Sequence, residues 1–306
     1  MALLTGKVHK LYGAVRLGAD YIDQNAELSL SPGLQTMLIS NGVDNSFAAI
    51  ARQDPRVRVG TSAVATALAL SGIGGLEIAA GATELDFWLR QGEFAGTYTA
   101  GAAHLQITGH NGLFYPLTLN ADGVSAAIRY EFAPAWDGTN DPLVLTPDQA
   151  LGGTPAVDEA FVVGPVMING VQLRGIQSVA VNFGIQVFQL FHEGEIWCVY
   201  LDIQKRSPSI VIRTADALSF NTFGLTGVAQ TATDSLIYLR AVEENKDRHA
   251  NAETEHIKIA VDDGIIYPSD LSADANTPYN GEVTIEPTWD GTNAVLAITT
   301  GQAIVL

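Results

Sequence analysis

Few residues in this 306-residue chain have the types and spacing that chemistry needs. The first candidate is the segment Trp136-Asp137-Gly138-Thr139-Asn140 with the following Asp141, where side-chain oxygens that could bind a cation lie close together. The same pentapeptide returns at 289–293, but there the next residue is Ala294, and calcium takes six or more oxygen ligands. Asp, Gly and Asn are also common turn residues. We therefore interpret the pentapeptide as a turn bounded by tryptophan.

A second candidate for metal binding is the group His249, Glu253, Glu255 and His256. Imidazole and carboxylate groups are metal ligands, but this spacing matches no established signature such as HExxH. At the related place in the first half of the chain only His104 is present. A run of charged residues such as this one usually lies on a solvated surface. The sequence therefore favours a charged surface loop, and we predict no metal site.

The remaining reactive groups also have simpler explanations. Cys198, the only cysteine, lies in an apolar segment, where a buried thiol acts as a small hydrophobic side chain. Gly72-Ile73-Gly74-Gly75 follows an expected helix, so it cannot present helix N-terminal amides to a phosphate. Asp262-Asp263 is expected in a turn, and no GxSxG, P-loop or CxxC motif is present. We predict neither an enzyme nor a cofactor.

An internal repeat organises the chain. Its most complete match joins Trp136-Asp137-Gly138 to Trp289-Asp290-Gly291, about half the chain apart. Other matches follow in the same order along both halves: Gly33-Leu34-Gln35 with Gly184-Ile185-Gln186, Pro55 with Pro208, Phe87-Trp88-Leu89-Arg90 with Ile237-Tyr238-Leu239-Arg240, His104 with His256, and Gly112-Leu113-Phe114-Tyr115-Pro116 with Gly264-Ile265-Ile266-Tyr267-Pro268. The shared positions are apolar strand residues and turn residues, which is typical of two copies of one fold.

The repeat predicts an N-terminal arm at residues 1–12 and two domains, at 13–151 and 152–306. Alternating apolar residues and turn signals predict a mainly β fold, with two tandem copies of an antiparallel β-sandwich or partly closed barrel. Each copy is expected to carry one short α-helix packed on it. The first is expected to begin at Thr61 or Ser62 and end at Gly72, and the second to begin at Thr214.

Turn signals also predict individual strand pairs. Asn41-Gly42 and Glu193-Gly194 are expected to close hairpins, and the strand after the second turn, 196–201, is apolar on both faces and therefore expected at the centre of a sheet. Asn111-Gly112 is predicted to close a hairpin between 104–108 and 113–119, and Asp263-Gly264 its counterpart.

Composition excludes several classes of function. The formal net charge of −17 argues against a nucleic-acid-binding protein, which needs clusters of Lys and Arg. The stretch 60–76 is the most membrane-like, but it is short and rich in Gly, Ser and Thr, so we expect no membrane helix. The first seven residues do not have the pattern of a signal peptide, and with a single cysteine this indicates a cytoplasmic origin.

The order of these elements resembles the major tail tube protein of long-tailed, siphovirus-like bacteriophages. The elements that carry the resemblance are the strand pair around 41–42 or 193–194, the Pro-bounded strands after Pro55 and Pro208, the Thr-capped helix and the Tyr-Pro segments. The resemblance covers nearly the whole chain and is to the type with two fused tube domains. It implies trimeric, pseudo-hexameric rings that stack into the tail tube of the virion and are assembled in the host cytoplasm. The partners implied are the chain itself, tail terminator and tail-tip proteins, and DNA that passes through an acidic lumen without specific binding.

Two diverged segments, 92–103 and 243–255, would then suit contacts between rings or subunits. The candidate residues there are Glu93, Tyr98, Glu243, Glu244, Asp247, His249 and Glu253.

Two other functions stay open. One is another phage structural part, such as a tail-end or capsid-decorating protein, which would stop at a single ring. The other is a tandem β-sandwich adhesin or carbohydrate-binding module, in which Trp136, Trp289 and Tyr98 would be stacking platforms.

Overall fold

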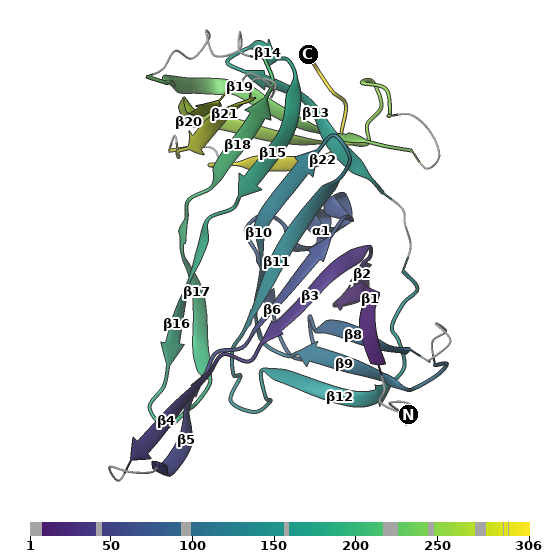
Figure 1. The fold of residues 1–306 in the computed structure, drawn as a ribbon, viewed down its shortest axis with the longest axis vertical. Helices are drawn as coiled ribbons and strands as arrows, with labels where there is room; N and C mark the ends of the chain where they lie inside the picture. The colour runs from purple at the N-terminus through teal and green to yellow at the C-terminus, as the bar shows by residue number, and fades with distance from the viewer. Residues whose placement is uncertain are drawn as a thin grey trace.

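β-Strands make up 65% of the chain and helix 3%, with large antiparallel sheets, which confirms the mainly β fold class and agrees with a β-sandwich. The computed structural model describes residues 8–40, 45–92, 99–155, 159–216, 226–243, 248–272, 280–289, 291–292 and 294–306. Figure 1 shows the strands in two main layers, with two hairpins that extend from the body.

The smaller layer is a five-stranded antiparallel sheet in the order β12-β9-β8-β1-β2. Its strands are β1 (Val8–Leu17), β2 (Asp20–Ile22), β8 (Leu85–Gly92), β9 (His104–Gly109) and β12 (Leu143–Gln149). Because β1 begins at Val8 and pairs with β8, residues 8–12 of the expected N-terminal arm belong to this sheet.

The larger sheet contains thirteen strands among the described residues, in the order β14-β13-β19-β20-β21-β18-β15-β10-β11-β6-β3, with β22 on β20 and β7 on β10. Five strands come from the first half of the chain: β3 (Asn25–Ser31), β6 (Arg56–Thr61), β7 (Leu76–Ile78), β10 (Gly112–Asp122) and β11 (Ala126–Pro134). Eight come from the second half: β13 (Phe161–Ile168), β14 (Val171–Leu173), β15 (Ile176–Asn182), β18 (Ser209–Thr214), β19 (Val228–Ala241), β20 (His256–Ser272), β21 (Asn280–Pro287) and β22 (Ala297–Gln302).

The same strand order occurs twice along the chain. The series β12-β9-β8-β1-β2 corresponds to β22-β20-β19-β13-β14, and the series β10-β11-β6-β3 corresponds to β20-β21-β18-β15. The two four-strand series are joined edge to edge because β10 pairs with β15. Figure 1 shows β3, β6, β11, β10, β15 and β18 running side by side across this junction.

Alternation along these strands places the core. Val57 and Val59 of β6, and Ile210 and Ile212 of β18, are fully buried, whereas the residues between them are exposed or half-buried. One apolar face of the large sheet therefore packs inward and the other stays polar, as antiparallel sheets commonly do.

The described part of the chain contains one helix, α1 (Val64–Ser71). It ends at Gly72, which has φ of 64°, as the sequence predicts. The predicted start at Thr61 or Ser62 is wrong: Thr61 belongs to β6, and the helix begins at Val64 after Ala63 without a side-chain cap, because Thr61 Oγ1 instead accepts the Ala63 amide at 3.0 Å. Most of the helix expected after Thr214 falls in 217–225, which lies outside the described residues. No helix that the structure describes has the length and apolar character to cross a membrane.

Two hairpins extend beyond the sheets: β4 (Leu34–Ser40) with β5 (Asn45–Gln53), and β16 (Ile185–Phe191) with β17 (Cys198–Arg206). Figure 1 shows β4 and β5 projecting from the body. The prediction that 196–201 is a central strand is wrong, because β17 belongs to a two-stranded sheet and Tyr200 is half exposed. Cys198 is buried as the sequence predicts, but Val199, Leu201 and Ile203 are only half-buried, so this strand leaves apolar surface available to another contact.

The predicted hairpins at Asn111-Gly112 and Asp263-Gly264 are also wrong. Strands β9 and β10 lie in different sheets, and β20 runs through Gly264 without a turn. A Cβ at Gly112 would lie 2.2 Å from the Ala133 carbonyl oxygen, and one at Gly264 would lie 2.4 Å from that of Glu286. These glycines are needed because a neighbouring strand passes too close for a side chain.

Candidate subunit interface

The junction between the two four-strand series is the most extensive contact between the halves. Strands β10 and β15 pair from Thr118↔Asn182 to Asp122↔Ser178. Their inward side chains join one core, since Leu119 of β10 and Val181 of β15 are each 1% exposed. The second series thus supplies an edge strand that completes the first.

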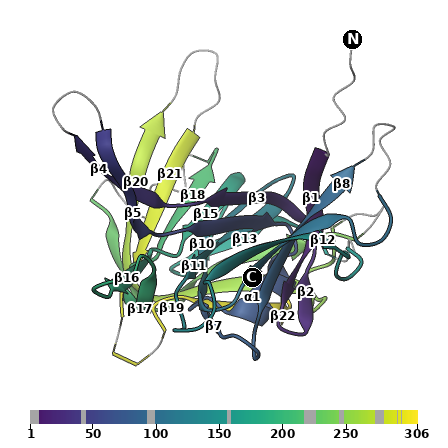
Figure 2. The same ribbon diagram turned by 90° about the horizontal axis from the view of Figure 1, so that it is seen from below.

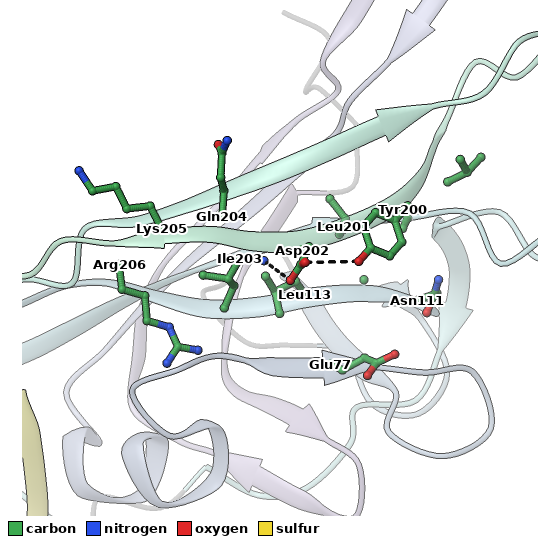
Figure 3. Close-up of a pocket in the computed structure, with 13 residues that line it drawn as sticks. Glu77, Asn111, Leu113, Tyr200, Leu201, Asp202, Ile203, Gln204, Lys205 and Arg206 are labelled. Carbon is green, nitrogen blue, oxygen red and sulfur yellow. Dashed lines mark hydrogen bonds between the residues drawn. The ribbon is translucent and has the colours of Figure 1, made fainter. Parts of the chain in front are cut away.

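The hairpin β16–β17 reinforces the junction from outside the sheet. The Trp136 amide donates to the Cys198 carbonyl oxygen at 2.7 Å, and Arg206 Nη2 donates to the Gly74 carbonyl oxygen at 3.1 Å. A cavity of about 780 Å³ separates β17 from β10 and β7. Figure 3 shows Glu77, Asn111 and Leu113 on one side of it, facing a row of residues from Tyr200 to Arg206 on the other.

The base of hairpin β4–β5 also contacts hairpin β16–β17 near its turn. The Gln53 amide donates to the Ile196 carbonyl oxygen at 2.7 Å, and Gln189 Nε2 donates to Asp54 Oδ1 at 2.8 Å. The guanidinium of Arg52 lies 3.2 Å from the ring centroid of Phe191, within the range of a cation–π contact. Together with the strand pairing, these contacts define what we call the internal joint.

The surfaces that correspond to the internal joint are exposed at the two ends of the chain. Leu271, the counterpart of Leu119, is 44% exposed, and Ile265, the counterpart of the half-buried Leu113, is 51% exposed. Trp289 is 69% exposed, whereas its counterpart Trp136 is half-buried. These apolar groups lie where the first half of the chain is covered by the second.

The corresponding strands also lie at edges of the sheet, as far as the described strands show. Among the described strands, β3 pairs only with β6, and residues 267–272 of β20 pair only with β21. An edge strand presents unpaired backbone groups that can add a strand from another chain. Each end of the chain therefore carries one half of a joint.

On the polar face of the large sheet, positive and negative side chains pair with one another across the strands. Three of its arginines bind glutamates of the same sheet: Arg58–Glu131 at 2.7 Å and Arg213–Glu282 at 2.6 Å join neighbouring strands, and Arg129–Glu27 at 2.9 Å reaches from β11 across β6 to β3. The bond to Glu131 raises the pKa of Arg58 further. Burial, then the hydrogen bond to Glu131, raises the pKa of Tyr115, so its phenol stays protonated.

The repeated pentapeptide forms the turn that the sequence predicts in the first half. Asp137 Oδ1 accepts hydrogen bonds from the amides of Thr139 at 2.8 Å and Asn140 at 2.7 Å. The bonds from Asn140 and then Thr139 lower the pKa of Asp137. Gly138 and Gly291 have φ of 90° and 93°, so the two turns share a conformation at this point. Asp290 and Asn293 lie outside the described residues.

Of the residues predicted for contacts between rings, Glu93, Tyr98, Glu244 and Asp247 lie outside the described residues. The other three, Glu243, His249 and Glu253, lie together at the end of β19. His256 does not join them, because its Nδ1 accepts the Ala241 amide and its Nε2 donates to the Ala250 carbonyl oxygen. His104 accepts the Gln91 amide in the same way, so this repeated histidine holds strand ends in both halves.

Sequence reasoning missed the projecting hairpins as candidate contact surfaces. Large apolar side chains are exposed on both: Leu34, Met37, Leu38, Ile39, Ile50, Phe188, Leu190 and Tyr200. The available signal was the repeated Gly33 and Gly184, where a Cβ would lie 1.7 Å from the Asp54 carbonyl oxygen and 1.9 Å from that of Ser207. These two glycines mark the points at which each hairpin leaves the sheet.

Comparisons with known proteins supply no family to set beside this geometry: no protein-family model matches the chain, and no curated protein sequence matches it.

Proposed function

We propose that this chain is a virion structural protein that assembles head to tail into rings, and that the rings stack into a tube for phage DNA. The observation that carries the proposal is the internal joint, whose two complementary surfaces recur in exposed form, one at each end of the chain. A contact between different surfaces of identical subunits closes into a ring when the rotation between subunits closes. A trimer is the expected ring because of the resemblance to tube proteins with two fused domains.

The internal joint predicts the register between subunits. In the chain, Asn120 pairs with Ala180, and by the repeat these residues correspond to Ser272 and Ser29. The end of β20 in one subunit would therefore pair with β3 of the next, with Ser272 opposite Ser29. This contact would cover the exposed Leu271 as β15 covers Leu119.

The polar face of the large sheet is the face we assign to the lumen. DNA binding depends on basic side chains that neutralise phosphates. Here Arg58, Arg129 and Arg213 already pair with glutamates across the strands, and the chain as a whole has a net charge of −17. A surface of this kind gives a passing duplex little to bind.

Stacking of rings is assigned to the two projecting hairpins. Isolated exposed apolar residues are ordinary, but a contiguous apolar patch marks a contact surface. The hairpin β4–β5 exposes several such residues without covering a core of its own chain, including Leu34, Met37 and Leu38. A hairpin of an adjacent ring, which is another copy of this chain, would bury them.

A cysteine cross-link tests the register. In a Cys198→Ser background, Ser29→Cys combined with Ser272→Cys should form disulfides between subunits, because residues opposite each other on antiparallel strands lie within disulfide range. On a non-reducing denaturing gel, closed rings would give a ladder ending at the covalent trimer. Electron microscopy over a concentration series should show rings or tubes.

The matched control is Asn120→Cys with Ala180→Cys, which should close a disulfide within one chain and leave it monomeric on the same gel. If this control forms its bond while the Ser29 and Ser272 pair gives only monomers, and microscopy shows isolated particles at every concentration, head-to-tail assembly is wrong.

A further inference from the structure

We propose that His249, Glu243, Glu253 and Glu255 form a binding site for one divalent transition-metal cation, with Zn²⁺ as the reference ion. The group lies where β19 ends and β20 has not yet begun. This site does not depend on the proposed function, because its argument uses only the side chains of one chain.

The geometry brings an imidazole and carboxylates within the reach of a single ion. Ligand atoms of Glu243, His249 and Glu253 all lie within 4.8 Å of one another. His249 Nδ1 is 2.5 Å from Glu253 Oε2 and 3.1 Å from Glu255 Oε2, and its Nε2 is 3.9 Å from Glu243 Oε1. Zinc binds nitrogen and carboxylate oxygen at about 2.0–2.2 Å, so its ligand atoms lie roughly 3 Å apart.

The balance of charge around His249 favours a metal site over an ion pair between the histidine and one glutamate. The carboxylates of Glu253 and Glu255 both approach His249 Nδ1, so a protonated His249 brings one positive charge to two negative charges there, and its single Nδ1 proton can form a straight hydrogen bond to only one of them. The His249 side chain is 11% exposed, whereas those of Glu253 and Glu255 are 46% and 62% exposed, so water screens the carboxylates more than the imidazole. A divalent cation at Nδ1 would replace that proton and offset two of the carboxylate charges.

The loop is held in place by bonds that the metal would not disturb. The His249 amide donates to the Ala241 carbonyl oxygen at 3.1 Å, and Arg240 Nη1 donates to the His249 carbonyl oxygen at 3.2 Å. Arg240 also binds Asn251 Oδ1, and His256 Nε2 donates to the Ala250 carbonyl oxygen. The His249 backbone is thus fixed. The side chains of Glu253 and Glu255 are 46% and 62% exposed, and the bond that Glu253 Oε2 accepts from the Ala250 amide, at 3.2 Å, still allows the shift of a few tenths of an ångström that coordination needs.

An open cavity of about 650 Å³ gives an ion access and leaves room for water ligands. Glu243, His249 and Glu255 line it, with Glu159 on its other side. Glu159 Oε1 accepts the Thr66 amide at 3.0 Å, so that carboxylate is engaged with α1 and is not counted among the ligands. Because Ala65 and Thr300 also line the cavity, it lies between the helix of the first half and β22 of the second.

The donor set selects the class of cation. Imidazole favours Zn²⁺, Cu²⁺, Ni²⁺ and Fe²⁺, whereas sites for Ca²⁺ and Mg²⁺ are built from oxygen. One nitrogen with two or three carboxylates therefore favours a transition metal over calcium. Removal of the imidazole should abolish that preference.

The test is calorimetric titration of the full chain, without a histidine tag and stripped with chelator, with ZnCl₂ at pH 7. We expect one Zn²⁺ per chain and, at a hundredfold excess over the dissociation constant, a rise in Tm of about 5 °C. His249→Ala and, separately, Glu253→Gln should each weaken Zn²⁺ binding at least about tenfold, since even outer partners of a metal are worth roughly 10- to 100-fold. CaCl₂ should bind far more weakly than ZnCl₂.

The matched control is His192→Ala, which removes an exposed histidine that also has glutamates nearby, Glu193 and Glu195, and should leave the titration unchanged. Circular dichroism of the metal-free variants checks that they fold, and Glu253→Gln carries the test if His249→Ala does not. No Zn²⁺ binding by the wild type would overturn the proposal. So would binding that survives in every folded ligand variant, or that is equally lost in His192→Ala.

Discussion

Replacement of Trp289 by alanine is predicted to weaken assembly while leaving the fold of the chain intact. Trp289 is 69% exposed, so its ring contributes little to the core of its own chain. Its counterpart Trp136 is half-buried, and its amide binds the Cys198 carbonyl oxygen of the hairpin that follows. In an assembled ring, the hairpin β4–β5 of the neighbouring subunit would cover Trp289 in the same way.

The magnitude follows from the surface that the neighbour would cover. A tryptophan side chain offers roughly 200 to 250 Å², so 69% exposure leaves roughly 150 Å² in water. If the neighbour covers about half of that, about 75 Å² is buried, worth about 2 kcal/mol at ~25 cal/mol per Å². Each joint would then be weakened by roughly 30-fold, since ~1.4 kcal/mol is a factor of ten.

Sedimentation over a concentration series measures this loss. A closed trimer contains three joints, so its association constant should fall by roughly the cube of 30, and the concentration at which half the protein is assembled, which enters that constant as its square, should rise on the order of 100-fold in Trp289→Ala. The Tm of the unassembled chain should change little, because the ring is exposed. Trp136→Ala is the matched control: it lies at the internal joint, so it should lower the Tm of the chain instead.

Two results would refute the reasoning. One is assembly of Trp289→Ala at the wild-type concentration, which would mean that no neighbour covers this ring. The other is a loss of Tm in unassembled Trp289→Ala as large as in Trp136→Ala, which would mean that Trp289 supports its own half of the chain. If Trp289→Ala instead abolished binding to glycans on an array and left assembly unchanged, the carbohydrate-binding alternative would take its place.

Two further predictions concern the strands that position the joint. Gly264→Ala should lower the free energy of unfolding by at least about 2 kcal/mol in urea titrations, because its Cβ would lie 2.4 Å from the Glu286 carbonyl oxygen. The control is Gly123→Ala, which has open space around it and should change the free energy of unfolding by less than about 0.5 kcal/mol. Equal effects of the two substitutions would contradict the close approach of β20 and β21. Burial lowers the pKa of His104 below its usual 6.5, so the folded chain favours the neutral imidazole, which accepts the Gln91 amide. This contribution to the stability of the fold is fully present above pH 6.5 and is lost as the pH falls below 6.5. Thermal unfolding between pH 7.5 and 5 should show this loss of Tm, and His104→Asn, which keeps an acceptor but cannot titrate, should flatten it; an unchanged slope in the variant would exclude His104 as its cause.

Local signals predicted the fold class because each half carries the same alternation and the same glycines. The strands after Pro55 and Pro208, and the stop of α1 at Gly72, could be predicted since they depend on nearby residues. Gly112 and Gly264 were assigned to hairpin turns because the dipeptides Asn-Gly and Asp-Gly are typical of two-residue hairpin turns. Their actual role depends on β11 and β21, which pass within reach of a Cβ from elsewhere in the chain.

The candidate interface could be predicted less well, since it depends on which apolar strands remain uncovered. Alternation in 185–191 and 198–206 is the pattern of any half-buried strand, and nothing in it distinguishes a core face from an exposed one. His249 and Glu253 were identified by residue type, but only the fold of the loop after β19 brings their ligand atoms together and places His249 beside a cavity. Sequence spacing alone gave no reason to favour a site there.

Exposed edges of this kind need a partner, and the repeat identifies which one. A long unpaired edge is a hazard, because it can pair with any other exposed strand. In this chain one copy of the joint is already closed, where β10 pairs with β15, and this leaves a single β3 edge and a single β20 edge. Both edges correspond through the repeat to the strands of the closed joint, so under the proposed function the partner of each would be the other end of an identical chain. Closure into a ring would cover both edges at once, with part of hairpin β4–β5 over Trp289 of the neighbour, and the apolar side chains of the hairpins that remain exposed would be left for the next ring.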